Sequence, residues 1–154
     1  MSAAPSSPPR IVAGVDGSPE SLAALRWAIR QARLTGGVVD AVIAWQLPVE
    51  MTGYGWSPMT VTECSSLIEK AGQTLAAAIG QVATASDRPY VHSVVEQGLP
   101  AQVLLDASVD AELLVVGSRG HGLFADTLLG TVGQHCFQHA HCPVVVMRGE
   151  LTAA

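Results

Sequence analysis

Short apolar runs alternate with segments of helical periodicity along almost the whole chain. The runs occupy residues 11–15, 38–45, 90–95, 113–116 and 143–147. Most of them are nearly continuous in apolar residues, which is typical of strands covered on both faces of a parallel sheet. The β-α-β-α-β-α-β-α-β alternation therefore predicts a single α/β domain. Its core would be a Rossmann-like open parallel sheet of five strands, with helices on both faces and right-handed crossovers.

The segments between the runs carry helix and loop signals. Ser18 followed by Pro19 predicts an N-cap and a first helical residue, and the glycine pair at 36–37 ends that helix. Residues 46–60 contain several Pro and Gly and predict a long loop. A long amphipathic helix should follow over 61–82. The apolar positions that we expect to pack on the sheet are Val61, Cys64, Ile68, Ala71, Leu75 and Val82.

Composition and charge narrow the range of partners. Hydrophobic residues make up 49% of the chain and charged residues 14%, which supports a packed core and argues against disorder. The net charge of −5, with eight Lys and Arg in total, leaves no basic surface for nucleic acid. No apolar run approaches the roughly 18 residues that a membrane span needs, so we expect no membrane partner.

The cysteines and the ends of the chain point to a cytoplasmic domain without disulfides. The three cysteines show no repeated spacing, which is not the pattern of a disulfide framework. The first nine residues are rich in Ser, Ala and Pro and lack the charged and apolar regions of a secretory signal. We expect a disordered tail over residues 1–9, one folded domain over 10–149 and a short tail over 150–154.

A glycine-rich stretch follows the fourth predicted strand. It contains Gly117 and Gly120, then nine residues, then Gly130 and Thr131. Glycines let the backbone approach an anion closely, and successive amides at the start of the last helix favour negative charge. Thr131 adds a hydroxyl donor and Arg119 adds a cation. The stretch therefore predicts a phosphate-binding loop.

A second unusual loop follows the first predicted strand, at Asp16-Gly17-Ser18. In open parallel sheets, ligands bind beyond the carboxyl ends of the strands where the strand order reverses, and an order of 3-2-1-4-5 places both loops there. Asp16 is suited to accept from a ribose hydroxyl or to help hold Mg²⁺ through water. Alternatively, it caps the helix that begins near Ser18. The chain has no Walker sequence, and the first strand is not followed by the dinucleotide fingerprint.

A zinc site near the end of the chain is an alternative use of the histidines. His135 and His139 lie four residues apart, beside Cys136 and Cys142, so the two histidines share a helix face. The ligand spacings of known closed sites are absent. A polar helix end beside two core cysteines accounts for the same residues, so we expect no metal held by protein side chains alone.

The glycine-rich stretch resembles that of universal stress proteins of the ATP-binding type. The motif of that family is G-x-x-G-x9-G-[S/T], and Gly117, Gly120, Gly130 and Thr131 match every fixed position. The segments 15–18, 98–101 and 142–146 are also typical of the family, so the resemblance covers nearly the whole chain. It implies an adenine nucleotide (ATP, ADP or AMP) bound with Mg²⁺ across the strand ends.

The resemblance implies that backbone groups hold most of the nucleotide. The implied contact residues are Gly14, Val15, Asp16, Ala44, Val116, Gly117, Ser118, Arg119, Gly120, Gly130, Thr131, Val132 and Gly133. Gly133 stands where some members carry a hydroxyl residue, which leaves the choice among ATP, ADP, AMP and cyclic nucleotides open. Members commonly dimerise through the last strand, where this chain has an apolar edge without charge or bulge. That edge consists of Val144, Val145, Val146 and Met147.

The resemblance thus implies a nucleotide-dependent stress-response regulator, a cytoplasmic homodimer with an unknown protein partner. No nucleophile–base pattern can be assigned by spacing, and nothing visible orients a water, so any ATP hydrolysis should be slow. Two alternatives stay open. One is a nucleotide hydrolase or adenylating enzyme of the same architecture, and the other is an interaction module with a vestigial nucleotide site.

Overall fold

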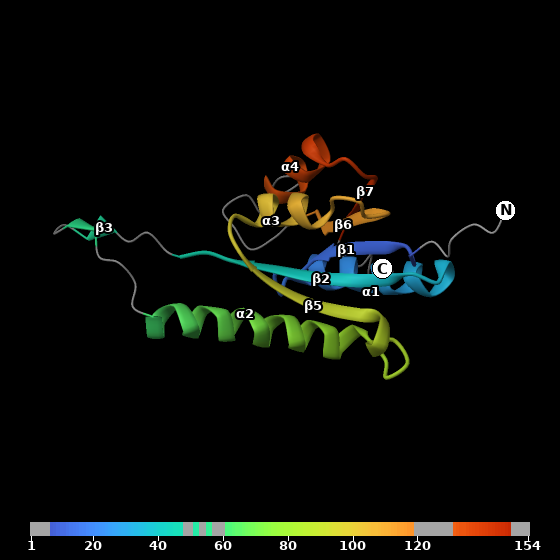
Figure 1. Cartoon of the computed structure of the whole chain (residues 1–154), viewed down its shortest axis with the longest axis horizontal. Helices are drawn as coiled ribbons and strands as arrows, with labels where there is room; N and C mark the ends of the chain where they lie inside the picture. The colour runs from blue at the N-terminus through green and yellow to red at the C-terminus, as the bar shows by residue number, and fades with distance from the viewer. Residues whose placement is uncertain (1–6, 48–50, 53–54, 57–60, 119–130, 149–154) are drawn as a thin grey trace, which may run out of the picture.

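A five-stranded parallel sheet forms the centre of the fold (Figure 1). The computed structural model describes residues 7–47, 51–52, 55–56, 61–118 and 131–148. In spatial order the strands are β5 (Val91–Gln97), β2 (Val38–Trp45), β1 (Arg10–Gly14), β6 (Leu113–Gly117) and β7 (Val144–Met147). Because β5, β6 and β7 are the third, fourth and fifth strands of this sheet along the chain, the predicted order of 3-2-1-4-5 is confirmed.

Helices cover both faces of the sheet, as the sequence predicts. Those on one face are α1 (Pro19–Thr35) and α2 (Val61–Val82), and those on the other are α3 (Pro100–Ala107) and α4 (Thr131–His139) (Figure 1). A 3₁₀ turn, η1 (Arg88–Tyr90), occupies the start of the predicted third strand. None of the described helices is long and apolar enough to cross a membrane.

The segment predicted as a long loop over 46–60 contains a small second sheet. Its strands, β3 (Met51–Thr52) and β4 (Gly55–Trp56), pair antiparallel. Two-residue strands are too short for hydrophobic periodicity to reveal them, so the sequence pattern shows only the Pro and Gly around them.

The core consists of two apolar layers, one on each face of the sheet. Alternate residues of a strand point to opposite faces, so Ile11 faces α1 and α2 while Val12 faces α3 and α4. Leu25 of α1 is fully buried in the first layer, and Leu114 of β6 is fully buried in the second. Because helices cover the sheet on both faces, the sequences of its strands are nearly continuous apolar runs.

Helix α1 begins and ends as its capping residues predict. Ser18 is the N-cap, its Oγ accepts from the Ser21 backbone N–H at 3.2 Å, and Pro19 is the first helical residue. Gly36 adopts φ +71° at the C-cap, a left-handed conformation that suits glycine. The amino end of α1 is therefore held in place next to the end of β1.

Ser18→Ala should lower the free energy of unfolding by about 1 kcal/mol, because it removes the acceptor for the Ser21 N–H. Ser66→Ala is the matched control, since the exposed Ser66 hydroxyl only donates to Thr62 O within α2. Chemical denaturation of both variants measures the difference. Equal stability of the two variants would show that the Ser18 cap contributes nothing.

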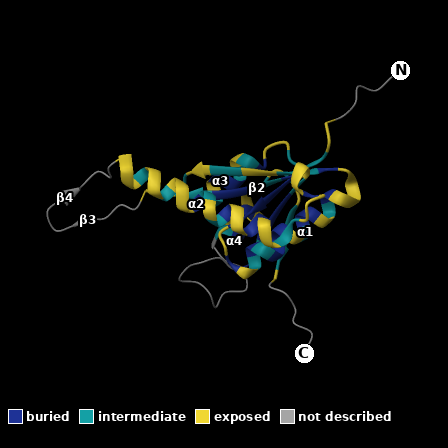
Figure 2. Cartoon of the chain, turned by 90° about the horizontal axis from the view of Figure 1, so that it is seen from below, coloured by how far each residue is buried: buried dark blue, intermediate teal, exposed yellow. Residues whose placement is uncertain are grey.

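Helix α2 departs from the expected packing. Of its predicted apolar face, Ala71 and Leu75 are buried, but Val61 is 84% exposed and Ile68 is 44% exposed. The first turns of α2 project beyond the ends of the strands on which the rest of the helix packs (Figure 2). Only the second half of this helix is docked on the core, although the apolar spacing continues through both halves.

An ion pair ties the end of α1 to the segment between α2 and β5. Arg33 Nε donates to Asp87 Oδ1 at 2.6 Å, and Arg33 Nη2 donates to Asp87 Oδ2. The Thr84 N–H and Oγ1 donate to Asp87 Oδ2 at 2.8 and 2.9 Å. Asp87 is only 4% exposed. The hydrogen bonds from Arg33 lower the pKa of this carboxyl far below its ordinary value, so it stays ionised in the folded protein.

Asp87→Asn should lower the melting temperature at pH 7 by roughly 5 °C, because the amide replaces an ionised acceptor of four hydrogen bonds. The pKa of Asp87 is lower in the folded than in the unfolded chain, so its contribution is complete above about pH 4. It is lost as the pH falls toward the folded pKa. The difference between wild type and variant should therefore shrink below about pH 4 and stay constant from pH 5 to 8. Melting scans across this range test it, and a difference that peaked at acid pH would contradict it.

Candidate functional site

The ends of β1 and β6 lie side by side at the point where the sheet reverses its order. β1 pairs with β2 on one side and with β6 on the other, and all of these strands are parallel. The chain first winds from β1 outward to β5 and then returns across the sheet to β6 (Figure 1). The carboxyl ends of β1 and β6 therefore lie at the point where the strand order reverses, which is where ligands bind in folds of this kind.

The loop after β1 is fixed by its own hydrogen bonds. Val15 N donates to Val42 O at 2.8 Å, and Asp16 Oδ1 accepts from Ser18 N at 2.9 Å. Gly17 has φ +85°, and a Cβ there would lie 3.1 Å from Thr74 Cγ2 of α2. The Asp16 carboxylate thus shapes the turn that leads into α1, while Ser18 provides the N-cap itself.

Ala44 places backbone groups near the carboxyl end of β1. The pairing of β1 with β2 ends at Gly14 opposite Val42, and Val42 O points toward β1, where it accepts from Val15 N. Backbone groups two residues apart on a strand point the same way. The N–H and C=O of Ala44 therefore face the β1 side, beyond the point where β1 has ended.

Gly117, at the end of β6, is a glycine because of the neighbouring helix. A Cβ at this position would lie 2.8 Å from Glu20 Cβ and 2.9 Å from the Glu20 carbonyl carbon. The first turn of α1 thus passes directly over the end of β6. The sequence pattern assigned this glycine to phosphate approach alone and missed Glu20, whose position depends on how α1 packs on the sheet.

Ser118 continues from Gly117 and is anchored to the edge strand. Its backbone N–H donates to Met147 O at 2.7 Å, and the residue is 3% exposed. This hydrogen bond occupies the Ser118 amide, so a ligand would have to meet other atoms of the loop. The bond also couples the loop after β6 to the end of β7.

The remaining predicted contact residues divide into four groups. Val15 and Val116 are buried with their side chains in the core, and Val132 packs against the layer that contains Val116, so only their backbones can serve a ligand. Gly14 faces the Leu104 side chain, and Gly133 is buried in α4. Thr131 is the first residue of α4. Outside the described residues lie Arg119, Gly120 and Gly130.

The described part of the two loops carries little charge. Over residues 15–18 and 117–118, Asp16 is the only ionisable side chain. A phosphate held there would rely on amide donors, on the amino end of α4 or on a cation bound with it. The site chemistry in this part of the chain is therefore that of backbone recognition with a single carboxylate.

The histidines and cysteines of α4 do not gather into a metal site within the described chain. No group of three or more His, Cys, Asp or Glu there could hold a metal ion. The rings of His135 and His139 are in contact, with 4.5 Å between centroids and a tilt of 45° between their planes. Cys136 is fully buried, and burial raises the pKa of its thiol to about 11, which keeps it protonated at neutral pH.

Comparison with known proteins shows the family to which this chain belongs. The model of the universal stress protein family matches residues 9–148. The chain belongs to the universal stress protein family. Universal stress protein Rv2623 of Mycobacterium tuberculosis is 32% identical over 148 residues, covering 91% of this chain and 48% of that protein. A universal stress protein of Mycolicibacterium smegmatis is 33% identical over 156 residues, covering 94% of this chain and 49% of that protein. The chain thus spans about half the length of these curated relatives.

Solved structures of universal stress proteins share this fold. UspA from Lactobacillus plantarum superposes with a TM-score of 0.73 at 22% identity, over 93% of this chain and 99% of that one. A universal stress protein in complex with cAMP gives a TM-score of 0.57 at 23% identity, over 94% of this chain and 100% of that one. A family protein from Arabidopsis thaliana with AMP bound gives 0.59 at 15% identity, over 94% of both chains. At these identities the superpositions establish the fold alone.

Proposed function

We propose that this universal stress protein binds an adenine nucleotide, with ATP and Mg²⁺ as the first candidates, and acts as a nucleotide-dependent regulator of a stress response. The observation that carries the proposal is that β1 and β6 pair in parallel at the switch point of the sheet, with Gly117 at the end of β6 lying against Glu20 in the first turn of α1. Two structures of the same fold, one in complex with cAMP and one with AMP bound, support the proposal. Adenine and a phosphate group are common to those ligands.

Each part of the nucleotide crevice, the proposed site at the carboxyl ends of β1 and β6, suits one part of the nucleotide. The backbone of Ala44 faces the position where adenine would lie, and Gly14 to Asp16 would flank the ribose. Gly130, Thr131 and Gly133 would meet the outer phosphates at the amino end of α4, where free amides favour negative charge. Asp16 would complete the set by accepting from ribose or by holding the water of a bound Mg²⁺.

A regulator fits this site better than a fast enzyme does. Catalysis of phosphoryl transfer needs cations on the phosphates and a group that orients the attacking water. Over 15–18 and 117–118 the chain supplies one carboxylate and no Lys or Arg. The glycine-rich stretch of the sequence adds a single cation, Arg119. We therefore expect ATP turnover, if it is measured, to be far slower than the roughly 1–100 s⁻¹ of ordinary kinases.

We also infer a homodimer through β7. This strand lies at the end of the sheet, and within the described chain it pairs only with β6. Its residues Val144–Met147 are all partly exposed and apolar, which is the kind of edge that another strand covers. The three cysteines are free thiols, in keeping with the cytoplasmic location that we propose.

The test is to purify the protein under native conditions and to identify any retained small molecule by mass spectrometry. Calorimetric titration of the stripped protein with ATP, ADP, AMP and cAMP, with and without Mg²⁺, then ranks the nucleotides. Binding of any of them supports the proposal. Failure of all four would overturn it in favour of an interaction module, and rapid multiple turnover of ATP would favour an enzyme.

Thr131→Val should weaken ATP binding about tenfold while leaving adenosine binding unchanged, because it removes a hydroxyl at the amino end of α4 without changing the side-chain shape. Thr35→Val is the matched control, since its hydroxyl only donates to Gln31 O at the far end of α1. Calorimetric titration of both variants measures the change. An equal loss for ATP and adenosine would show that Thr131 does not contact phosphate.

A further inference from the structure

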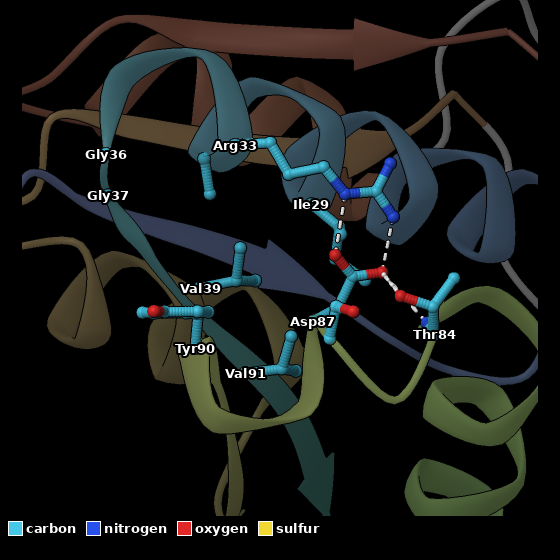
Figure 3. A pocket seen from close by; sticks show the side chains of 11 residues that line it. Ile29, Arg33, Gly36, Gly37, Val39, Thr84, Asp87, Tyr90 and Val91 are labelled. Carbon is cyan, nitrogen blue, oxygen red and sulfur yellow. Dashed lines mark hydrogen bonds and ion pairs between the residues drawn. The ribbon is translucent and has the colours of Figure 1, made fainter.

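A pocket of about 470 Å³ lies at the amino end of the sheet, away from the nucleotide crevice. It is bounded by the last turns of α1, the first residues of β2 and β5, and the segment that leads into β5 (Figure 3). The crevice lies at the carboxyl ends of the same parallel strands. A ligand in the pocket would therefore be separated from a nucleotide by the length of the strands.

The floor of the pocket is apolar and tightly held. Ile29, Ala32 and Val39 form its base, and because each of them is at most 5% exposed, they close the pocket from below and add little surface to it. Val91, the first residue of β5, closes the floor on one side, and Tyr90 stands at the rim with 57% exposure (Figure 3). This lining suits an aromatic or branched aliphatic group, and the volume is in the range of sites for small organic molecules.

The polar wall of the pocket is neutral overall. It is formed by the Arg33–Asp87 ion pair, with Thr84 bonded to the same carboxylate (Figure 3). Since the guanidinium and the carboxylate compensate each other, the wall offers hydrogen bonds but no net charge. A charged ligand would lose its hydration there without a free counter-charge, which is costly.

The pocket is formed in advance of any ligand. Asp87 is held by hydrogen bonds from both Arg33 and Thr84, so the wall does not have to rearrange. At Gly36, which lies on the lining, a Cβ would meet no atom within 4 Å, so this side of the mouth is open. A preformed cavity binds with little cost of ordering.

We propose that this pocket is a second binding site, for a small neutral molecule with an aromatic or branched aliphatic body and a hydroxyl or amide group. The apolar body would lie against Val91 and Tyr90, above the closed base formed by Ala32 and Val39. The polar group would meet the wall formed by Arg33 and Asp87. The site is independent of the nucleotide crevice, so both ligands are bound at once.

The experiment uses 1-naphthol as the probe and 1-naphthoate as its anionic counterpart, each titrated into isotope-labelled full-length protein with and without saturating ATP and Mg²⁺. We expect naphthol to shift the amide resonances of Ala32, Val39 and Val91, with the same affinity whether or not ATP is present. Naphthoate should bind about tenfold more weakly, because its charge is not compensated in the pocket. Shifts confined to 15–18 and 117–118, competition by ATP, tighter binding of naphthoate, or no binding below about 1 mM naphthol would each overturn the proposal.

Ala32→Leu places three more carbon atoms on the floor of the pocket and should weaken naphthol binding about tenfold. Ala77→Leu, the same change at an exposed position of α2, should leave binding unchanged. Because Ala32 is buried, Ser86→Phe at the exposed rim serves as a second variant that does not disturb the core. It should also weaken binding. Wild-type affinity in Ser86→Phe together with wild-type affinity in a folded Ala32→Leu would place the probe elsewhere.

Discussion

Gly117→Ala should lower the free energy of unfolding by about 3 kcal/mol, at the upper end of the usual cost of overpacking. The added Cβ would lie 2.8 Å from Glu20 Cβ and 2.9 Å from the Glu20 carbonyl carbon. The second of these atoms belongs to the backbone of a packed helix and cannot swing aside as a side chain can. Relief would require α1 to move off the sheet at its first turn, which would disturb both the Ser18 cap and the loop after β1.

Gly72→Ala is the matched control for this substitution. Gly72 lies in the interior of α2, and a Cβ there would meet no atom within 4 Å. Alanine should stabilise the protein there by about 0.5–1 kcal/mol, because it loses less conformational freedom on folding than glycine does. Denaturant titration of both variants measures the two opposite changes. A stable Gly117→Ala protein would show that α1 does not press on the end of β6.

The contact between Gly117 and Glu20 also affects the interpretation of nucleotide-binding experiments on Gly117 variants. Because alanine at this position strains the junction of α1 and β6, loss of nucleotide would follow from local disruption even if no phosphate touches Gly117. Thr131→Val changes no backbone and leaves the side-chain shape intact. It is therefore the more specific test of phosphate recognition.

Leu75→Ala should lower the free energy of unfolding by about 3 kcal/mol, within the range for truncating a fully buried leucine. Leu75 is 1% exposed between α2 and the sheet, so the substitution removes apolar burial and leaves a cavity. Ile68→Ala, seven residues earlier on the same helix, should cost less than about 1 kcal/mol, because Ile68 is 44% exposed. Both changes truncate a large aliphatic side chain, so the comparison isolates burial.

Thermal or denaturant unfolding of these two variants tests how α2 is docked. The expected result is a large loss for Leu75→Ala and a small one for Ile68→Ala. Similar losses in both would mean that the first half of α2 is packed on an apolar surface in solution. A self-association contact on α2, at the opposite edge of the sheet from β7, would supply such a surface, so the measurement should be repeated at two protein concentrations.

The topology could be predicted from sequence because it follows from one short pattern, an apolar run followed by a helical segment, that recurs along the chain. Five apolar runs separated by helical segments leave few arrangements in which every run is covered on both faces. Ser18, Pro19 and Gly36 act within a single turn of chain, and the structure places them at the ends of α1 as expected. The glycine spacing also predicted the family, which the comparisons confirm.

The packing of α2 could not be predicted in the same way. The apolar stripe of this helix continues from Val61 to Val82, yet its buried residues begin at Ala71. Periodicity reports which face of a helix is apolar, but it does not report how far the neighbouring sheet extends. The length of the sheet beneath α2 depends on where β2 and β5 end, so it is a property of the assembled fold.

The order of the five sheet strands, the caps of α1 and the family's glycine motif can be recognised in the sequence, because each depends on residues that lie near one another along the chain. The approach of Glu20 to Gly117, the hydrogen bond from Ser118 to Met147, and the pocket lined by Arg33 and Asp87 follow from the folded arrangement alone. The last of these pairs spans 54 positions. Contacts between residues so far apart arise from the packing of helices on the sheet, and no local pattern encodes them.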